Sequence, residues 1–273
     1  MMPSYAEVFA RTVISLDPYA EEIVYIGGWV HALYLAEANA AERPVYTTDI
    51  DVALPHRLRA GDRPALLELV EAAGYTVQSL ANESGLFEIF HTGPGLAEID
   101  LDLFTSAASP REVVWIEGQS GLAVQGFPDQ RILLENTRWM EVGTRIHPLL
   151  HPPRRIRVPT LPAYILVKGL SSSTRRSPGK QAKDLVYLME IARHPRLGAN
   201  TLREMPEIAA RYPDEYRAWR AHLHRASGDV LLLGEVADQL LEAGRSLAPR
   251  EDGVRSAVAH LRRLLGETPE ARE

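Results

Sequence analysis

Acidic and apolar residues alternate in the stretch "TTDIDVAL" at residues 47–54. Residues two apart in a β-strand point to the same side, so Asp49 and Asp51 project together while Ile50 and Val52 face the other way. Two adjacent carboxylates repel each other unless a cation lies between them, and a divalent ion held by oxygen ligands meets that need. An edge strand with solvated acids is the alternative.

A second stretch, "AEIDLDLF" at residues 97–104, repeats this alternation. Its acids Glu98, Asp100 and Asp102 share one face. If the two strands lie side by side, Asp100 or Asp102 supplies a third carboxylate, and the cluster can hold one or two magnesium ions. Such a pair of ions stabilises the attacking and leaving oxygens of phosphoryl transfer. A hairpin with one wet face explains the alternation equally well.

The pair Gly27-Gly28 follows the apolar run "IVYI" and precedes a helical segment. Glycines at a strand-to-helix turn let the backbone approach a ligand closely, and the amides at the start of the helix can hold a phosphate. A glycine turn with a purely structural role is the alternative.

The first half of the chain alternates between helical and extended patterns, which indicates an α+β fold with a mixed β-sheet and packed helices. Gly74 is placed to end one helix. The turn signal "GPG" between "GLFEIFHT" and "LAEIDLDLF" predicts a hairpin. We expect helices at about residues 4–14, 29–42 and 63–73, and strands at 22–26, 45–54, 85–92 and 96–104.

Five prolines between residues 147 and 162 disfavour a helix there and favour extended structure. Beyond this stretch, apolar residues recur three or four apart, which predicts a C-terminal helical domain. We therefore expect two domains: residues 1–150, which contain both acidic strands, and residues 151–273, a helical domain that contributes basic residues to the cleft.

Residues 152–183 carry basic side chains and no acid, on a chain whose net charge is −6. Such a region can follow a nucleic-acid backbone or clamp a triphosphate, or it can be a solvated loop. We expect "SSSTRRSPGKQ" to form a mobile loop. The basic residues are Arg154, Arg155, Arg157, Lys168, Arg175, Arg176, Lys180 and Lys183.

The composition excludes several kinds of site. With no cysteine among 273 residues, thiol nucleophiles, zinc-thiolate sites and iron-sulfur clusters are absent, and oxygen or imidazole must hold any metal. No window approaches the roughly 18 apolar residues that a membrane span requires. We expect a cytoplasmic protein with no membrane partner.

These residues resemble the DNA polymerase beta-like nucleotidyltransferase superfamily, and within it the AbiEii-type toxin nucleotidyltransferases of type IV toxin-antitoxin systems. Those proteins pair a glycine-rich turn with an aspartate-any residue-aspartate strand and a third acid from a later strand. Further on, a lysine inside one helix precedes a lysine-aspartate pair that opens another. The matching positions are Gly27, Gly28, Thr48, Asp49, Asp51, Asp100 or Asp102, Lys168, Lys183 and Asp184.

The resemblance implies that residues 1–150 form a nucleotidyltransferase catalytic domain. It implies transfer of a nucleoside monophosphate from a nucleoside triphosphate to a hydroxyl acceptor, with RNA such as tRNA as the acceptor and an antitoxin protein as a partner. It implies that Asp49, Asp51 and Asp100 or Asp102 hold magnesium, or alternatively manganese. It assigns nucleotide binding to Gly27, Gly28, Thr48, Lys168 and Lys183, and a catalytic role to Lys168 and Asp184 in addition to the metal-binding acids.

Other interpretations remain open at this stage. Lys168 can be a surface lysine on a helix, and Asp184 a first-turn acid stabilised by the helix dipole. The enzyme can instead modify a small molecule such as an antibiotic, or the fold can serve as a catalytically inactive binding module.

Overall fold

The structure, a computed structural model, describes residues 4–39, 47–59, 61–93, 96–242 and 250–266. Its two compact units lie within Met1–Ala36 with Tyr46–Thr160, and within Glu37–Val45 with Leu161–Glu273. In the described ranges, no helix combines the length and the apolar character needed to cross a membrane.

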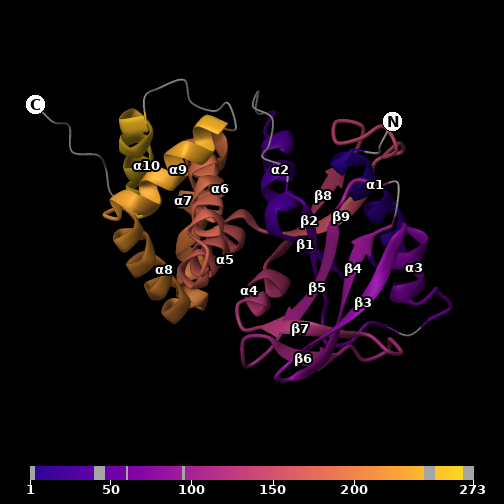
Figure 1. The fold of residues 1–273 in the computed structure, drawn as a ribbon. Coiled ribbons are helices and arrows are strands. Elements are labelled where there is room, and N and C mark those ends of the chain that lie inside the picture. The colour runs from indigo at the N-terminus through magenta and orange to yellow at the C-terminus, as the bar shows by residue number, and fades with distance from the viewer. Residues whose placement is uncertain (1–3, 40–46, 60, 94–95, 243–249, 267–273) are drawn as a thin grey trace, which may run out of the picture. The chain divides into compact units, whose positions relative to one another are not determined.

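The first unit is built on a mixed seven-stranded sheet (Figure 1). Its main path runs β1-β2-β5-β4-β3, and β7 pairs with both β5 and β6. The β2–β5 and β5–β7 pairs are parallel and the others antiparallel. The strands are β1 Val24–Ile26, β2 Asp49–Ala53, β3 Tyr75–Asn82, β4 Gly85–Thr92, β5 Asp100–Ser106, β6 Glu112–Trp115 and β7 Ala123–Phe127.

Aromatic packing positions the turn between β1 and α2. Phe9 stacks on Trp29 with the ring centroids 4.2 Å apart, and its edge meets Tyr25 at 5.9 Å. All three rings are buried, and such pairs add about 0.5–1.5 kcal/mol to the free energy gained from burial alone. This cluster holds the residues on both sides of Gly27-Gly28. The helices of the unit are α1 Tyr5–Ser15, the short 3-10 helix Asp17–Tyr19, α2 Gly27–Glu37, α3 Leu66–Ala72 and α4 Gln130–Glu135.

Two predictions about local structure are confirmed. Gly74 follows α3 with a φ of +99°, a left-handed conformation that suits glycine at the end of a helix. β4 and β5 are antiparallel neighbours, with His91 opposite Asp100. Of the "GPG" turn between them, Pro94 and Gly95 lie outside the described residues.

The proline-rich stretch ends in a strand of the first unit. β8 (Thr137–Val142) and β9 (Arg154–Pro159) form an antiparallel two-stranded sheet, and β9 packs next to β1. Arg154, Arg155 and Arg157 therefore belong to the sheet-containing unit, which extends to Thr160. The functional roles expected for the two domains stay predictions.

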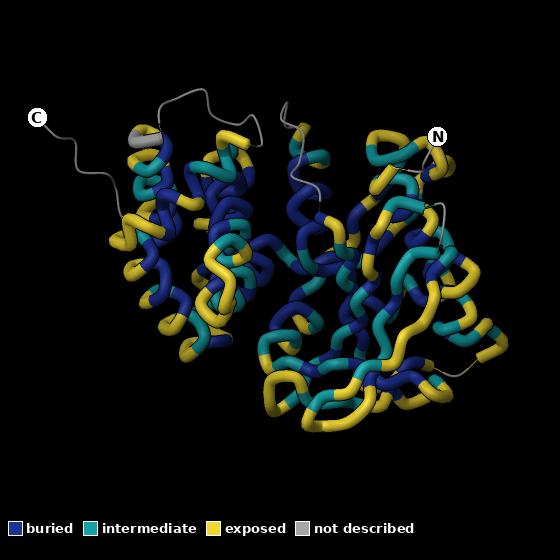
Figure 2. Tube along the Cα trace, viewed as in Figure 1, coloured by how far each residue is buried: buried dark blue, intermediate teal, exposed yellow. Residues whose placement is uncertain are grey.

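The second unit is helical in its described part. α6 packs against α5, α7, α9 and α10, and most residues of α5 and α6 are buried, in contrast to the mostly exposed β3 (Figure 2). The helices are α5 Leu161–Thr174, α6 Pro178–Arg193, α7 Pro195–Arg211, α8 Pro213–Ala226, α9 Val230–Glu242 and α10 Arg250–Leu264. The fold class predicted from the sequence, a mixed sheet with packed helices followed by a helical region, is confirmed.

The prediction of a mobile loop at "SSSTRRSPGKQ" is wrong. α5 continues through Thr174, and α6 already begins at Pro178, so only three residues connect the two helices. Proline fits the first turn of a helix because the amide it lacks has no partner there. The sequence of small and basic residues resembled a loop, but packing on α6 keeps the end of α5 helical.

Candidate active site

The β1–α2 turn brings the backbone of Gly27 against a carboxylate. Gly27 has a φ of +71°, and a Cβ at this position would lie 1.7 Å from Oδ2 of Asp51. Any other residue would therefore displace the Asp51 side chain and strain the backbone. At Gly28, a Cβ would lie 2.8 Å from Cβ of the buried Thr47, so the second glycine is required by packing.

The register of β2 and β5 aligns two pairs of aspartates. Asp49 lies opposite Asp100 and Asp51 opposite Asp102 in this parallel pair. Neighbouring residues in paired strands point to the same face, so all four side chains form one row on one face of the sheet. On the opposite face, Ile50, Val52, Leu101 and Leu103 are buried. The expected adjacency of the two acidic strands is confirmed, and these four aspartates are called the carboxylate row below.

One member of the row has an unsatisfied buried atom. Among the described residues, Oδ1 of Asp49 is buried without a hydrogen-bond partner. A buried carboxylate oxygen with no donor is costly, and a cation is one remedy. The amides at the start of α2, next to Asp51, supply further positive potential.

The donor set fits a hard divalent cation. Carboxylate oxygens are the ligands that magnesium and manganese prefer. Within the described part of the chain, no three histidine, aspartate or glutamate side chains converge as a ready-made metal cluster. Magnesium is usually held by one or two carboxylates together with substrate phosphates, so two acids of the row suffice for a site that a triphosphate completes.

Asp100 and Asp102 occupy different surroundings. Asp100 is exposed, and its Oδ1 lies 2.5 Å from Nδ1 of His91, whose Nε2 lies 3.1 Å from Oε1 of Gln78. Asp102 is half-buried and lies opposite Asp51, the residue in contact with Gly27. The register thus separates an inner pair, Asp51 and Asp102, from the outer pair Asp49 and Asp100.

Thr48 lies at the start of β2 with an exposed side chain. Its carbonyl accepts a hydrogen bond of 3.0 Å from the amide of Asp100, which helps to set the register of the two strands. The nucleotide-binding roles predicted for Thr48, Gly27 and Gly28 stay predictions.

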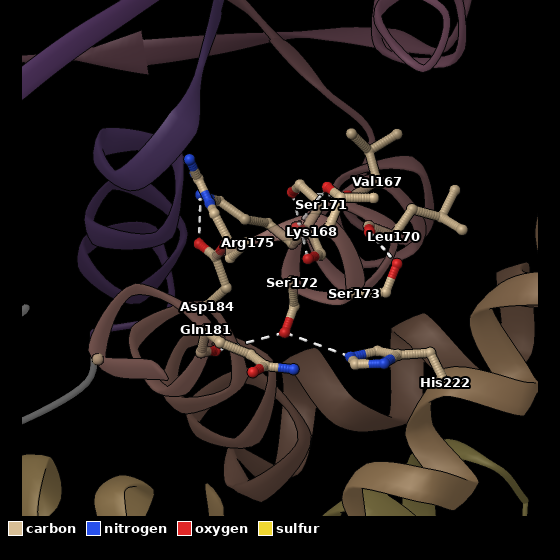
Figure 3. A network of polar contacts seen from close by, with 12 residues as sticks. Val167, Lys168, Leu170, Ser171, Ser172, Ser173, Arg175, Gln181, Asp184 and His222 are labelled. Carbon is tan, nitrogen blue, oxygen red and sulfur yellow. Dashed lines mark hydrogen bonds and ion pairs between the residues drawn. The ribbon is translucent and has the colours of Figure 1, made fainter. Parts of the chain in front are cut away.

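The remaining predicted site residues, Lys168, Lys183 and Asp184, belong to the second unit, and Figure 3 shows Lys168 and Asp184. Nζ of Lys168 on α5 donates to Oδ1 of Asp184 at 2.9 Å, and Nε of Arg175 donates to Oδ2 at 3.2 Å. The Asp184 side chain is only 4% exposed, so a buried carboxylate is held by two cations. Lys168 and Lys183 also both lie near the ring of Tyr187, at 5.4 and 5.9 Å from its centroid.

The simpler interpretation of Asp184 as a first-turn acid is wrong. α6 begins at Pro178, and its first turn contains no acid. Asp184 lies further along the helix, where burial rather than the helix dipole sets its surroundings. Lys168 is not a surface lysine either, because its side chain is only 13% exposed. The catalytic and phosphate-binding roles predicted for Lys168, Lys183 and Asp184 stay predictions.

Sequence reasoning missed His91 and Arg175 as partners of predicted site residues. The position of His91 just before the "GPG" turn was a usable signal, because a hairpin closed there brings His91 next to the start of the acidic strand. Arg175 had no such signal, since its contact with Asp184 depends on how α5 and α6 pack.

Comparison with known proteins shows similarity to solved structures. No protein-family model and no curated protein matches the chain. Among solved structures, the chain is similar to an antigenic nucleotidyltransferase-like protein from Paracoccidioides brasiliensis, with 12% sequence identity and a TM-score of 0.39. The match covers 81% of this chain and 94% of that one.

Proposed function

We propose that the protein is a divalent-cation-dependent nucleotidyltransferase that moves a nucleoside monophosphate from a nucleoside triphosphate to a hydroxyl acceptor. The observation that supports this most is the inner pair of the carboxylate row: Asp51 and Asp102 lie opposite each other in parallel strands, and Asp51 lies against Gly27. Acids concentrated beside the amino end of a helix suit a substrate that arrives with phosphates and a metal ion.

The proposed chemistry assigns a role to each residue of the first unit. Asp49 and Asp51 would hold magnesium or manganese, which when bound neutralises the triphosphate and polarises its α-phosphate. The amides at the start of α2 would bind phosphate oxygens, and Gly27 lets the Asp51 carboxylate lie against the same turn. Asp102, with Asp51, would orient the acceptor hydroxyl and accept its proton as the oxygen attacks the α-phosphorus. The bond to pyrophosphate breaks, and pyrophosphate leaves with its electron pair.

The acceptor and the cellular role follow from the resemblance described above. We propose RNA, in the form of tRNA, as the acceptor, and a role as the toxin of a toxin-antitoxin pair with a cognate antitoxin protein. Residues 152–183 of a chain whose net charge is −6 carry eight basic residues and no acid, which supports an anionic partner. Three of the eight already pair with acids from elsewhere in the chain, Arg154 with Asp17 and Lys168 and Arg175 with Asp184, so the support comes from the other five.

One transfer assay tests the proposal. The full-length protein is incubated with magnesium, each α-labelled nucleoside triphosphate in turn and either total tRNA or small hydroxyl compounds, including aminoglycosides. We expect label on RNA, and loss of that label in Asp51→Asn. Label confined to small acceptors would assign the activity to a different substrate class. No transfer to any acceptor with magnesium or manganese would contradict the proposed function.

A further inference from the structure

The two-stranded β8–β9 sheet exposes a tryptophan beside arginines. Trp139 is 39% exposed, and the guanidinium of Arg155 lies over its ring, 5.0 Å from the centroid. Arg157 is directly opposite Trp139 across the pair, so it projects from the same face, as does Arg155 two residues away. Trp139, Arg155 and Arg157 are called the ribbon face below.

The ribbon face carries positive charge that is only partly neutralised. Arg157 donates to the backbone carbonyl of Glu21 at 2.9 Å and to Oγ1 of Thr137 at 2.6 Å, so neutral oxygens orient its charge. Glu141 lies directly opposite Arg155 across the pair and shares this face, but within the described part of the chain Arg155 makes no ion pair with it or with another acid. Together β8 and β9 contain four arginines and one glutamate, although the whole chain is acidic.

A second exposed tryptophan in the same unit lies on a strand without arginines. Trp115 at the end of β6 is 63% exposed and lies opposite Ala123 of β7. Its strand contains one acid, Glu112, and no basic residue. Trp29 and Trp219 are both buried. The chain thus offers one exposed indole with arginines and one without, which is a matched pair for experiment.

We propose that the ribbon face binds single-stranded nucleic acid. An exposed indole can stack on any base, and guanidinium groups that make no ion pair can bind the phosphates between bases. An acidic peptide would satisfy the arginines and leave the indole without a stacking partner, so the combination favours nucleotides. β9, the strand that carries Arg155 and Arg157, packs next to β1, the strand that leads into Gly27.

Binding of nucleic acid by the ribbon face does not depend on the proposed function. A role of this face in holding the RNA acceptor during nucleotide transfer does rest on the proposed function. The two can fail separately. Oligonucleotide binding through Trp139 without any nucleotide transfer supports the ribbon face and counts against the enzyme assignment. Transfer to RNA with unchanged binding in the Trp139 variants overturns the ribbon face and leaves the enzyme assignment intact.

Intrinsic fluorescence locates the contact. Full-length wild type, Trp115→Phe and Trp139→Phe are titrated with 12-nucleotide single-stranded RNA and DNA of mixed sequence, with a 12-base-pair duplex as a third ligand. We expect quenching by the single strands in wild type and Trp115→Phe, and little quenching in Trp139→Phe. RNA and DNA arms show which sugar is preferred. Quenching that survives in Trp139→Phe, or stronger binding of the duplex, overturns the proposal.

Affinity measurements with labelled single-stranded oligonucleotide quantify how much each residue of the ribbon face contributes to binding. Trp139→Ala should weaken binding about 10-fold or more. Arg155→Glu should weaken it and lower the salt dependence, because each phosphate contact contributes a slope of about −0.7 for a single strand. Trp115→Ala should bind as wild type, and poly-glutamate should not compete. Equal weakening by the Trp115 and Trp139 variants, or competition by poly-glutamate at equal charge, overturns the proposal.

Discussion

Aspartates lie in opposite surroundings in the two units of this chain. In the sheet unit, the carboxylate row gathers four acids on one face, and within the described residues Asp49 even has a buried oxygen without a partner. In the helical unit, the buried Asp184 is held by Lys168 and Arg175. Clustered like charges cost stability and persist where a ligand uses them, whereas a paired buried acid contributes to the fold. The same substitution should therefore act differently in the two places.

The largest effect is expected in the carboxylate row. Asp51→Asn should lower nucleotidyl transfer roughly 1000-fold, because a lost metal ligand removes several kcal/mol of transition-state stabilisation. Its melting temperature should stay the same or rise, since one of several repelling charges is removed. Label transfer and thermal unfolding measure the two effects. Retained transfer, or a clear loss of stability, would contradict this assignment.

Asp184→Asn, in contrast to Asp51→Asn, should lower the stability of the protein. Removing the charge leaves Lys168 partly buried without its counter-ion, which costs about 3 kcal/mol. Urea unfolding followed by helical circular dichroism measures the loss. Asp214→Asn is the matched control, because Asp214 on α8 pairs with Arg217 at an exposed site, and its loss should change stability by about 0.5 kcal/mol or less. Equal effects at both positions would show that Asp184 contributes no more than a surface acid.

Gly27→Ala should lower both the stability of the sheet unit and the rate of nucleotidyl transfer. The new methyl group would overlap Asp51, and a left-handed backbone strains any residue with a Cβ, so we expect a loss of about 1–2 kcal/mol together with reduced transfer. Gly61→Ala serves as control, because a Cβ at Gly61 meets nothing within 4 Å. If Gly27→Ala behaves like Gly61→Ala in both assays, the close contact between Gly27 and Asp51 is unimportant.

The smallest expected effect is on the pH dependence of stability, through a histidine of the helical unit. Burial, and next the charge of Arg225, lower the pKa of His222 below its usual value. The unfolded chain therefore takes up a proton near pH 6.5 while the folded chain resists it, so stability present above pH 6.5 is lost as the pH falls below it. Melting temperatures at pH 7.5 and 5.5 should differ less for His222→Gln than for wild type. His224→Gln, on the exposed side of α8, should keep the wild-type difference.

Local sequence patterns predicted the elements of the site well. Alternation in "TTDIDVAL" and "AEIDLDLF" was enough to place both acidic strands and to put their acids on one face. The choice between Asp100 and Asp102 was left open, because strand register depends on pairing between distant segments and is not written in either stretch. Register now distinguishes Asp102, opposite Asp51, from Asp100, which contacts His91.

Burial was harder to predict than secondary structure. The helical pattern around Lys168 and Asp184 was recognised, but the sequence did not reveal that α6 starts at Pro178 or that Asp184 is enclosed. The helix α7 and the pairing of β8 with β9 were also not foreseen. Both arise from packing between segments, which outweighs local propensity.

Cation binding tests the central claim most directly. Bound Mn²⁺ is measured by electron paramagnetic resonance, in the presence of a non-hydrolysable triphosphate analogue, for wild type, Asp100→Asn and the double variant Asp49→Asn/Asp51→Asn. The proposed metal ligands predict that wild type and Asp100→Asn bind Mn²⁺ with similar affinity and that the double variant loses binding while remaining folded. Wild-type affinity in the double variant would contradict a metal centre at Asp49 and Asp51.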